Sequence, residues 1–368
     1  MLNFFEGANM AHKLKTAAIF LVLLLTTAWA GEGKQTTAAV KFTTKELPLP
    51  GATGLVTLDY FAYEPAHERI WVPAGNLGAV EVIDARSDQI TPIPGFRTAE
   101  REIRGQRRVL GPSSASIGDG VVYVGSRADS SICALSTTTL KLGDCISSAS
   151  PAQGLVGAPD AVVYVPLTKE VWVTRAAPPL GIAAPDRSLS IFDASDPQHL
   201  KPKGKMAVEG SAEGYAVDLK RGRFYTNIEE DGRTLAIDPR TRKIVSTWHS
   251  GCSDPRGLAL DTQRGFLFVA CSARVIALDL NHDGRVLGSI DTGDGLDNIG
   301  YSEAEHRLYA AASVAAKLTV ASVDAQGQMQ MIANVPTVAG ARGVIATSPG
   351  HAYMIDPRGG KIWKVTAQ

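Results

Sequence analysis

Short apolar runs separated by polar turns follow one another along almost the whole chain. In the stretch SDPRGLALDTQRGFLFVAC, from Ser253 to Cys271, two such runs are joined by a tight polar turn, and Arg256 stands just before the first run. Short runs bounded by Gly, Pro, Asp and Ser are typical of β-strands, and segments with a long 3.6-residue period are almost absent. The pattern therefore predicts an all-β protein.

The second apolar run of this stretch belongs to a set of seven, each with an aromatic residue in its second position. The seven runs are IWVPAG from Ile70, VYVGSR from Val122, VWVTRA from Val171, FYTNIE from Phe224, LFVACS from Leu267, LYAAAS from Leu308 and AYMIDP from Ala352. An apolar run and a polar turn precede each of them. A third run that ends near an acidic residue follows most of them, and then a fourth, more polar run. Each unit thus predicts four short strands.

The spacing of the units predicts how they pack. Counted from the residue just before each first strand, successive units lie 41 to 54 residues apart. Four-stranded units repeated at roughly 40 to 50 residues are typical of a β-propeller, in which each sheet buries its faces against its neighbours. We predict a single seven-bladed β-propeller domain of four-stranded antiparallel blades over residues 31–368, with blades beginning near residues 54, 108, 158, 211, 253, 295 and 340.

The two ends of this region complement each other. The last unit has only three strands after Arg342, whereas a spare strand from Ala39 to Pro50 has no unit of its own. Pairing of this strand with the C-terminal one would complete the seventh blade and leave no long exposed edge. We therefore predict that the N-terminal strand closes the ring, and we expect a monomer, because a closed ring needs no partner to cover its edges.

The fourth unit carries the most regular motif. It contains FYTN (Phe224 to Asn227) within the hairpin DLKRGRFY from Asp218, followed by AIDPRT (Ala236 to Thr241). These segments resemble the YVTN-type repeats of bacterial secreted seven-bladed propellers, and the resemblance spans essentially the whole mature chain. It implies the propeller fold. Relatives of this architecture include lactonases, sugar-acid hydrolases, redox enzymes and binding scaffolds, so the resemblance implies no single function.

The N-terminus has the pattern of a secretory signal peptide. Its basic, apolar and small-residue parts are Lys13 and Lys15, the run AAIFLVLLL from Ala17 to Leu25, and Ala28-Trp29-Ala30. The apolar run is short for a membrane span. We predict that residues 1–30 are cleaved after Ala30 and that the mature protein is periplasmic or secreted without a membrane span. A retained anchor is the alternative, and translation could start at Met1 or Met10.

Export gives the four cysteines a meaning, because an even number of cysteines in an oxidising compartment favours disulfides. Cys133 and Cys145 flank a predicted hairpin turn, and Cys252 and Cys271 lie at the two ends of the opening stretch. We predict two structural disulfides from these four residues, with buried free thiols as the alternative. The absence of any C-x-x-C motif gives no support to a zinc ribbon, thioredoxin-type redox chemistry or c-type haem.

Charge and motifs narrow the function classes further. Lys and Arg total 37 and Asp and Glu total 37, so the basic surplus typical of nucleic-acid binding is missing and we expect no nucleic-acid partner. The chain has no H-E-x-x-H, G-x-S-x-G, Walker or dinucleotide-binding motif. No motif therefore assigns an enzyme class.

Alignment of the units places mostly charged residues where the first strands open onto the central channel. These positions, which we call the mouth, are Asp59, Ser113, Asp160, Glu213, Arg256, Asp297 and Arg342. Charges that converge on a narrow opening are costly unless they pair, hold an ion or bind a ligand. One interpretation is a ring of salt bridges. A second is Ca²⁺ held by the four acids Asp59, Asp160, Glu213 and Asp297. A third is a small polar or anionic ligand held by Arg256 and Arg342.

Two long loops are expected on the same face as the mouth. One runs from Gly95 to Gly111 and contains five arginines, and the other is the Pro-rich segment from Arg175 to Arg187. Long loops at one end of a rigid scaffold often carry function. We therefore predict an exported scaffold that presents the mouth and the loops to a small polar ligand or a partner protein. The alternative is a calcium-assisted hydrolase of lactone or sugar-acid type, which would use the carboxylates of the mouth.

Overall fold

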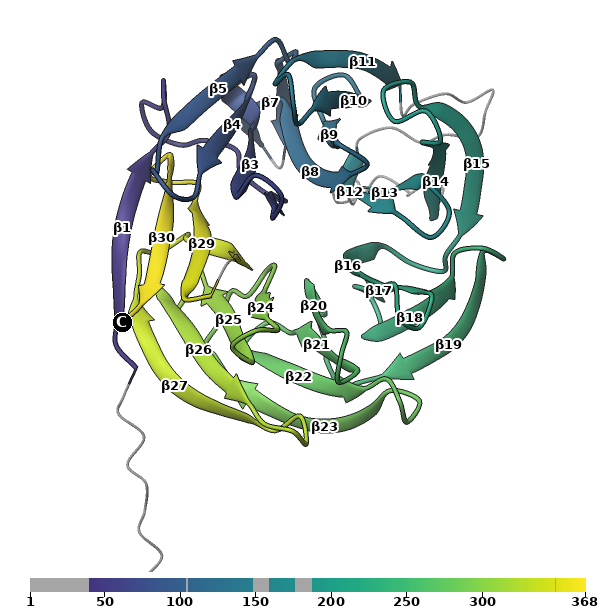
Figure 1. Ribbon diagram of the computed structural model, residues 1–368, viewed down its shortest axis with the longest axis vertical. Coiled ribbons are helices and arrows are strands. Elements are labelled where there is room, and N and C mark those ends of the chain that lie inside the picture. The colour runs from purple at the N-terminus through teal and green to yellow at the C-terminus, as the bar shows by residue number, and fades with distance from the viewer. Residues whose placement is uncertain (1–39, 104, 148–158, 176–186, 348) are drawn as a thin grey trace, which may run out of the picture. The chain divides into compact units, whose positions relative to one another are not determined.

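The computed structural model describes residues 40–103, 105–147, 159–175, 187–347 and 349–368. The unit from Ala39 to Gln368 contains seven four-stranded antiparallel sheets in a ring (Figure 1), which confirms the predicted fold. The predicted signal peptide lies outside the described residues. No helix within the described ranges is long and apolar enough to cross a membrane.

Blades 1 to 6 are each built from consecutive strands. Blade 1 contains β2 (Ala62–Glu64), β3 (Arg69–Ala74), β4 (Ala79–Asp84) and β5 (Ile90–Pro94), with the 3-10 turn η1 (Gly75–Leu77) after β3. Blade 2 contains β8 (Pro112–Gly118), β9 (Val121–Ser126), β10 (Ser131–Ser136) and β11 (Leu142–Ser147). Blade 3 contains β12 (Pro159–Val165), β13 (Glu170–Arg175), β14 (Ser188–Asp193) and β15 (Lys201–Ala207).

The next three blades repeat this order. Blade 4 contains β16 (Ala212–Asp218), β17 (Arg223–Ile228), β18 (Arg233–Asp238) and β19 (Lys243–His249). Blade 5 contains β20 (Leu258–Asp261), β21 (Phe266–Ala270), β22 (Arg274–Asp279) and β23 (Arg285–Asp291). Blade 6 contains β24 (Gly300–Ser302), β25 (Arg307–Ala312), β26 (Lys317–Val323) and β27 (Met329–Pro336).

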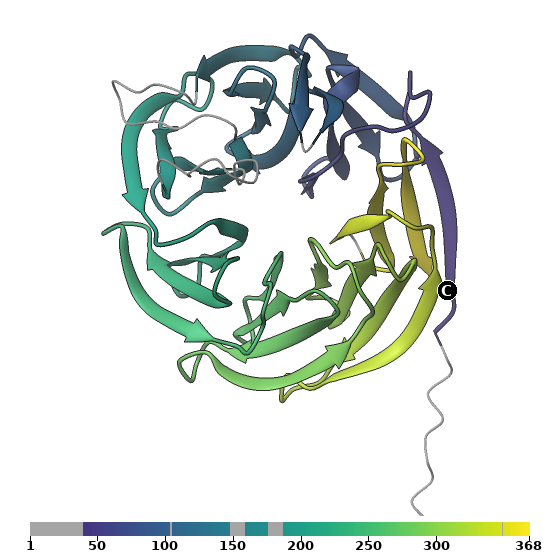
Figure 2. The same cartoon turned by 180° about the vertical axis from the view of Figure 1, so that it is seen from behind.

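Blade 7 combines the two ends of the described chain. Its strands are β28 (Arg342–Ala346), β29 (His351–Asp356), β30 (Lys361–Ala367) and β1 (Phe42–Pro48). β1 pairs antiparallel with β30, from Phe42 opposite Ala367 to Pro48 opposite Lys361. β1 is the outermost strand of this blade in both views (Figures 1 and 2). The predicted closure by the N-terminal strand is therefore confirmed.

The repeated aromatic residue explains why each unit folds as a blade. All seven second-position aromatics are at most 2% exposed: Trp71, Tyr123, Trp172, Tyr225, Phe268, Tyr309 and Tyr353. They fill the space between neighbouring sheets, as where Trp172 of blade 3 lies with its ring centroid 5.0 Å from that of Phe224 in blade 4. Burial of one such side chain contributes about 1.5–3 kcal/mol. The core is therefore distributed around the ring, one layer per blade junction.

A buried acid fixes the turn between the first two strands in blades 4 and 5. Asp218 is fully buried and accepts bonds from the backbone nitrogen and the guanidinium of Arg221, at 2.9 and 3.0 Å. Asp261 does the same with Arg264, at 2.8 and 2.6 Å. Charge-assisted bonds of this kind stabilise a buried carboxylate. The spacing Asp-x-x-Arg in the repeat therefore serves the fold.

The segment from Gly95 to Gly111 is more ordered than the predicted long loop. It forms a two-stranded antiparallel hairpin of β6 (Ala99–Ile103) and β7 (Gln106–Leu110) between blades 1 and 2. The apolar positions of β7 and the alternating charges of β6 allow the two strands to pair. The many arginines of the segment made it resemble a polar loop in the sequence. The other predicted long loop falls largely on residues 176–186, outside the described residues.

Candidate functional site

The strands that line the channel bring most of the aligned mouth residues to one end of it. Asp160, Glu213 and Arg342 lie at the starts of β12, β16 and β28, the first strands of their blades. Asp59 and Asp297 lie in the segments that lead into β2 and β24. These five residues interact electrostatically with one another, so the structure places them around one opening.

Arg127 is the main cation of the mouth, although the alignment did not include it. Its Nη2 is 2.9 Å from Asp59 Oδ2 and also contacts Asp160 Oδ1, and its Nε donates to the Pro159 carbonyl at 3.2 Å. Burial lowers the pKa of Arg127, but the carboxylates of Asp160 and Asp59 outweigh burial and hold the pKa above its ordinary value. Arg127 therefore joins blades 1, 2 and 3 through one guanidinium.

Tyr60 crosses the channel from blade 1 to blade 4. Its Oη donates to Glu213 Oε1 at 2.9 Å and accepts from the Gly214 backbone nitrogen at 3.3 Å. Its ring stacks on Tyr215, with centroids 5.9 Å apart, and it packs into the core cluster of blades 3 and 4. The phenol therefore links blades 1 and 4 and is in direct contact with one of the charged residues.

The mouth holds excess negative charge in a buried setting. Burial raises the pKa of Asp59 to about 6, even though Arg127 and Arg342 lower it. Burial also raises the pKa of Glu213 well above its usual range, and the charges of Asp160 and Asp297 add to this effect. The four carboxyl groups of the mouth thus share the guanidinium groups of Arg127 and Arg342, because Arg256 pairs with Glu229 and Asp254. Glu213 is therefore harder to ionise than an ordinary glutamate.

Arg342 and Ser113 have different roles. Arg342 pairs with Asp297 at 3.2 Å and donates to the Leu58 carbonyl at 3.2 Å, while its buried Nε has no partner among the described residues. Ser113 is 1% exposed, and its Oγ donates to the Gly125 carbonyl of its own blade at 3.5 Å. Arg342 is therefore part of the charged cluster, whereas the Ser113 hydroxyl is bonded to the backbone of its own blade.

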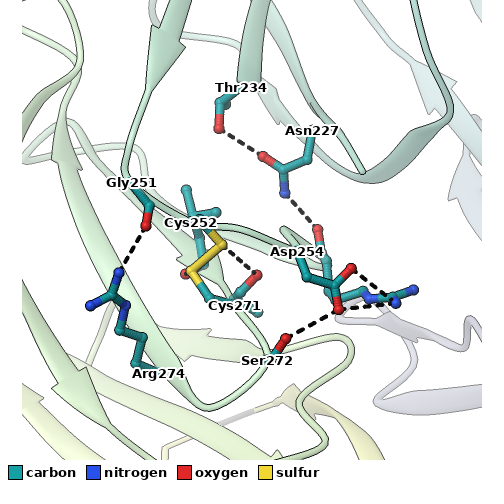
Figure 3. Close-up of a disulfide and its surroundings, with 11 residues drawn as sticks. Asn227, Thr234, Gly251, Cys252, Asp254, Cys271, Ser272 and Arg274 are labelled. Carbon is teal, nitrogen blue, oxygen red and sulfur yellow. Dashed lines mark hydrogen bonds and ion pairs between the residues drawn. A yellow bond between two sulfur atoms is a disulfide. The ribbon is translucent and has the colours of Figure 1, made fainter. Parts of the chain in front are cut away.

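Arg256 pairs with acids that the alignment left out. Its guanidinium lies 2.9 Å from Glu229 Oε1 and 3.1 Å from Asp254 Oδ1. Its backbone carbonyl accepts a 2.6 Å bond from Nδ2 of Asn227, whose Oδ1 in turn accepts from Thr234 at 2.7 Å (Figure 3). The Asn of the FYTN motif therefore fixes the backbone at the rim of the mouth.

Both predicted disulfides are present. Cys133 is bonded to Cys145 across β10 and β11, and Cys252 is bonded to Cys271. The second disulfide lies beside Asp254 (Figure 3), and it joins the segment that carries Asp254 and Arg256 to the end of β21, next to Ser272, whose Oγ donates to Asp254 at 3.1 Å. No free cysteine is present in the described chain.

Sequence reasoning missed Arg127, Tyr60, Glu229 and Asp254. One signal was available for two of them, because Arg127 and Glu229 each stand four residues after the aromatic of their unit. A charged residue at the end of the second strand is thus a further mark of the mouth. Tyr60 carried no signal, since nothing in its local sequence indicates contact with a blade far along the chain.

The four acids show no arrangement typical of a metal centre. Across the residues that the structure describes, no group of three or more His, Cys, Asp and Glu side chains could hold a metal ion. Asp59 and Asp160 are engaged by Arg127, Asp297 by Arg342 and Glu213 by Tyr60. A calcium site at the mouth thus gains no support from these residues and stays a prediction.

Comparison with known proteins defines the fold alone. No known family and no curated protein matches the sequence. A chain of the crystal structure of the mitotic checkpoint complex has a TM-score of 0.66 and 11% identity, covering 92% of this chain and 98% of that chain. Hydrazine synthase of Kuenenia stuttgartiensis has a TM-score of 0.65 and 11% identity, covering 87% of this chain and 98% of that chain. Streptogramin B lyase has a TM-score of 0.64 and 11% identity, covering 89% of this chain and 98% of that chain.

Removal of the Tyr60 hydroxyl is expected to weaken the fold modestly. Tyr60→Phe keeps the ring stack but deprives Glu213 and Gly214 of a partner, so the free energy of unfolding should fall by about 1–2 kcal/mol. Tyr215→Phe is the matched control, because the described structure gives its hydroxyl no hydrogen bond, and it should cost less than about 0.5 kcal/mol. Urea unfolding measures both. Equal losses in the two variants would contradict the proposed role of the hydroxyl.

Proposed function

We propose that the mouth binds a small polar ligand that carries a positively charged group, and that the protein is an exported binding scaffold. The observation behind this proposal is the buried excess of carboxyl groups. Asp59 and Glu213 have raised pKa values, which means that negative charge at the mouth is poorly compensated. A cation that entered would supply the missing charge without a rearrangement of the blades.

The existing contacts favour a cation over an anion. Arg127 already pairs with two carboxylates, and Arg342 pairs with Asp297 and donates to a backbone carbonyl. An anionic ligand would have to displace these partners and would meet the charge of the remaining acids. A cationic ligand would instead approach Glu213 and Asp297. The stacked rings of Tyr60 and Tyr215 lie beside Glu213, and the faces of aromatic rings also attract positive charge. The proposed ligand is therefore opposite in charge to the anionic ligand expected from Arg256 and Arg342.

Export rests on separate support. Two disulfides join all four cysteines, which fits an oxidising compartment outside the cytoplasm. The sequence pattern of residues 1–30 suggests how the chain would reach it. The calcium-assisted hydrolase has no comparable support among the described residues, and the likeness to streptogramin B lyase is one of fold.

The test is isothermal titration of the mature protein with the diamine putrescine, with citrate as the anionic comparison and Ca²⁺ as the metal comparison. Putrescine should bind, and its affinity should rise as the pH rises through about 6, since a cation prefers the ionised form of Asp59. Glu213→Gln and Asp297→Asn should each weaken binding about tenfold.

Glu68→Gln is the matched control, because Glu68 lies in the turn between β2 and β3 and pairs with Arg86. It should leave the affinity for putrescine unchanged. Binding of citrate in preference to putrescine would overturn the charge assignment. Tight binding of Ca²⁺ that is lost in Glu213→Gln would favour the metal-dependent alternative instead.

A further inference from the structure

A cavity lies apart from the mouth, between blades 1 and 2. It has a volume of about 410 Å³, within the range of small-molecule sites. We call it the interblade pocket. Its lining residues are Gly95, Phe96, Arg97, Ser126, Asp129, Ser131, Cys133, Cys145, Ile146 and Ser147. None of them belongs to the aligned mouth positions.

One wall of the interblade pocket is a row of three serines across blade 2. Ser131 of β10 lies directly opposite Ser126 of β9 on one side and Ser147 of β11 on the other. Residues opposite one another in adjacent strands share a face and have Cβ atoms about 4.5–5.5 Å apart. The sheet therefore presents three hydroxyls in a line, and the Cys133–Cys145 disulfide lies beside them.

Ser126 supplies the sign that the row is built for a ligand. Its side chain is 1% exposed and lines the pocket, yet its Oγ has no hydrogen-bond partner in the described part of the chain. A buried hydroxyl without a partner has lost its hydrogen bonds to water and gained none in return. A ligand with a hydroxyl group could satisfy it, because both can donate and accept.

Next to the serine row, the pocket lining offers a loosely held donor and acceptor. Asp129 Oδ1 accepts from Ser131 Oγ at 2.7 Å, while its Oδ2 lies 4.0 Å from Arg97 Nε. That separation exceeds a hydrogen bond. A ligand hydroxyl could bond to both groups by donating to the carboxylate and accepting from the guanidinium. Phe96 and Ile146 add apolar surface for the carbon skeleton of the ligand.

From this arrangement we propose that the interblade pocket binds a neutral polyhydroxylated molecule of monosaccharide size. One carboxylate and one guanidinium cancel, so the lining does not select an ion. The remaining polar groups are hydroxyls, which pair with the adjacent hydroxyls of a polyol. The volume admits a small ring compound and excludes a folded partner. This site is independent of the cation site proposed at the mouth.

Isothermal titration of the full-length mature protein with D-glucose and with myo-inositol tests the proposal, with glycine and inorganic phosphate as zwitterionic and anionic comparisons. At least one polyol should bind and the two ions should not. Ser126→Ala should weaken polyol binding about tenfold while leaving the thermal stability of the free protein unchanged or higher, since the hydroxyl has no partner to lose.

Ser114→Ala is the matched control. Ser114 is a second buried serine of blade 2 whose Oγ lacks a partner among the described residues, but it lies outside the interblade pocket. It should leave polyol affinity unchanged, as should Glu213→Gln at the mouth. Arg97→Gln, on the exposed rim, should weaken binding severalfold without affecting folding.

Three results would overturn the proposal. The first is that neither polyol binds, and the second is that glycine or phosphate binds in preference. The third is that polyol binding survives Ser126→Ala and Arg97→Gln, or is lost in Glu213→Gln, either of which would place the ligand elsewhere.

Discussion

Replacement of Arg127 by methionine is expected to lower the free energy of unfolding near neutral pH by about 3–5 kcal/mol. The guanidinium pairs with both Asp59 and Asp160, and all three side chains are largely withdrawn from solvent. Without it, two carboxylates from blades 1 and 3 would face each other with no opposite charge between them. The loss should be measured by urea unfolding of the two proteins side by side.

The pH dependence of this loss separates charge from packing. The pKa of Asp59 is about 6 even with Arg127 present, so without the guanidinium the acids should take up protons more readily. The destabilisation of Arg127→Met should therefore shrink when the pH falls from about 7 to about 5. Arg274→Met is the control, because among the described residues Arg274 donates only to the Gly251 carbonyl, and this replacement should cost less than about 0.5 kcal/mol. A loss that is the same at both pH values would mean that packing, not charge, is the cause.

Replacement of Glu81 by glutamine should raise stability above neutral pH. Glu81 lies in β4, is 1% exposed, and its Oε2 has no partner in the described ranges. Burial raises the pKa of Glu81 to about 7 from an ordinary 4.5. The folded state therefore holds a proton that the unfolded state releases at lower pH. Stability is lost as the pH rises between these values, and above about 7 the penalty reaches about 3 kcal/mol.

The experiment compares wild type and Glu81→Gln by urea unfolding at about pH 5 and about pH 8. The variant should gain up to about 3 kcal/mol at the higher pH and little at the lower one. Glu64→Gln gives the contrast, since Glu64 is equally buried but accepts from Trp71 Nε1 at 3.1 Å and pairs with His67 at 2.6 Å. That variant should lose stability. A gain for Glu81→Gln that does not change with pH would contradict the assigned cause.

The fold could be predicted because its main signal repeats. Seven aromatic residues occupy equivalent buried positions, and each contributes to the same kind of junction between neighbouring sheets. The spare strand that became β1 could be identified for a similar reason, since a ring of four-stranded blades lacked one strand. Repetition makes local sequence informative about distant packing, because every unit faces the same problem.

The mouth was predicted only in part, because alignment gives positions and not partners. It brought Asp59, Asp160 and Glu213 to one opening, but it also included Arg256, whose guanidinium pairs with Glu229 and Asp254. Which acid an arginine reaches depends on side-chain direction at the ends of strands. No repeat constrains that direction, since each blade differs there.

The interblade pocket could not be predicted at all. Ser126, Ser131 and Ser147 are separated along the chain and resemble ordinary polar strand ends. Only the pairing register of β9, β10 and β11 places them in one row. A shift of one residue would have turned these side chains to the other face of the sheet.

The pairing of β1 with β30 determines the order in which the ring can be completed. β1 is the earliest strand of the ring to be synthesised and β30 the latest, so no shorter nascent chain can contain a finished seventh blade. The hairpins of blades 1 to 6 can form as they emerge, whereas the final joint must wait for nearly the entire polypeptide. Because the entropic cost of loop closure grows only slowly with chain length, this last step is only moderately more costly than the closure of a much shorter loop. The ring is therefore closed by the pairing of the first strand to be synthesised with the last one.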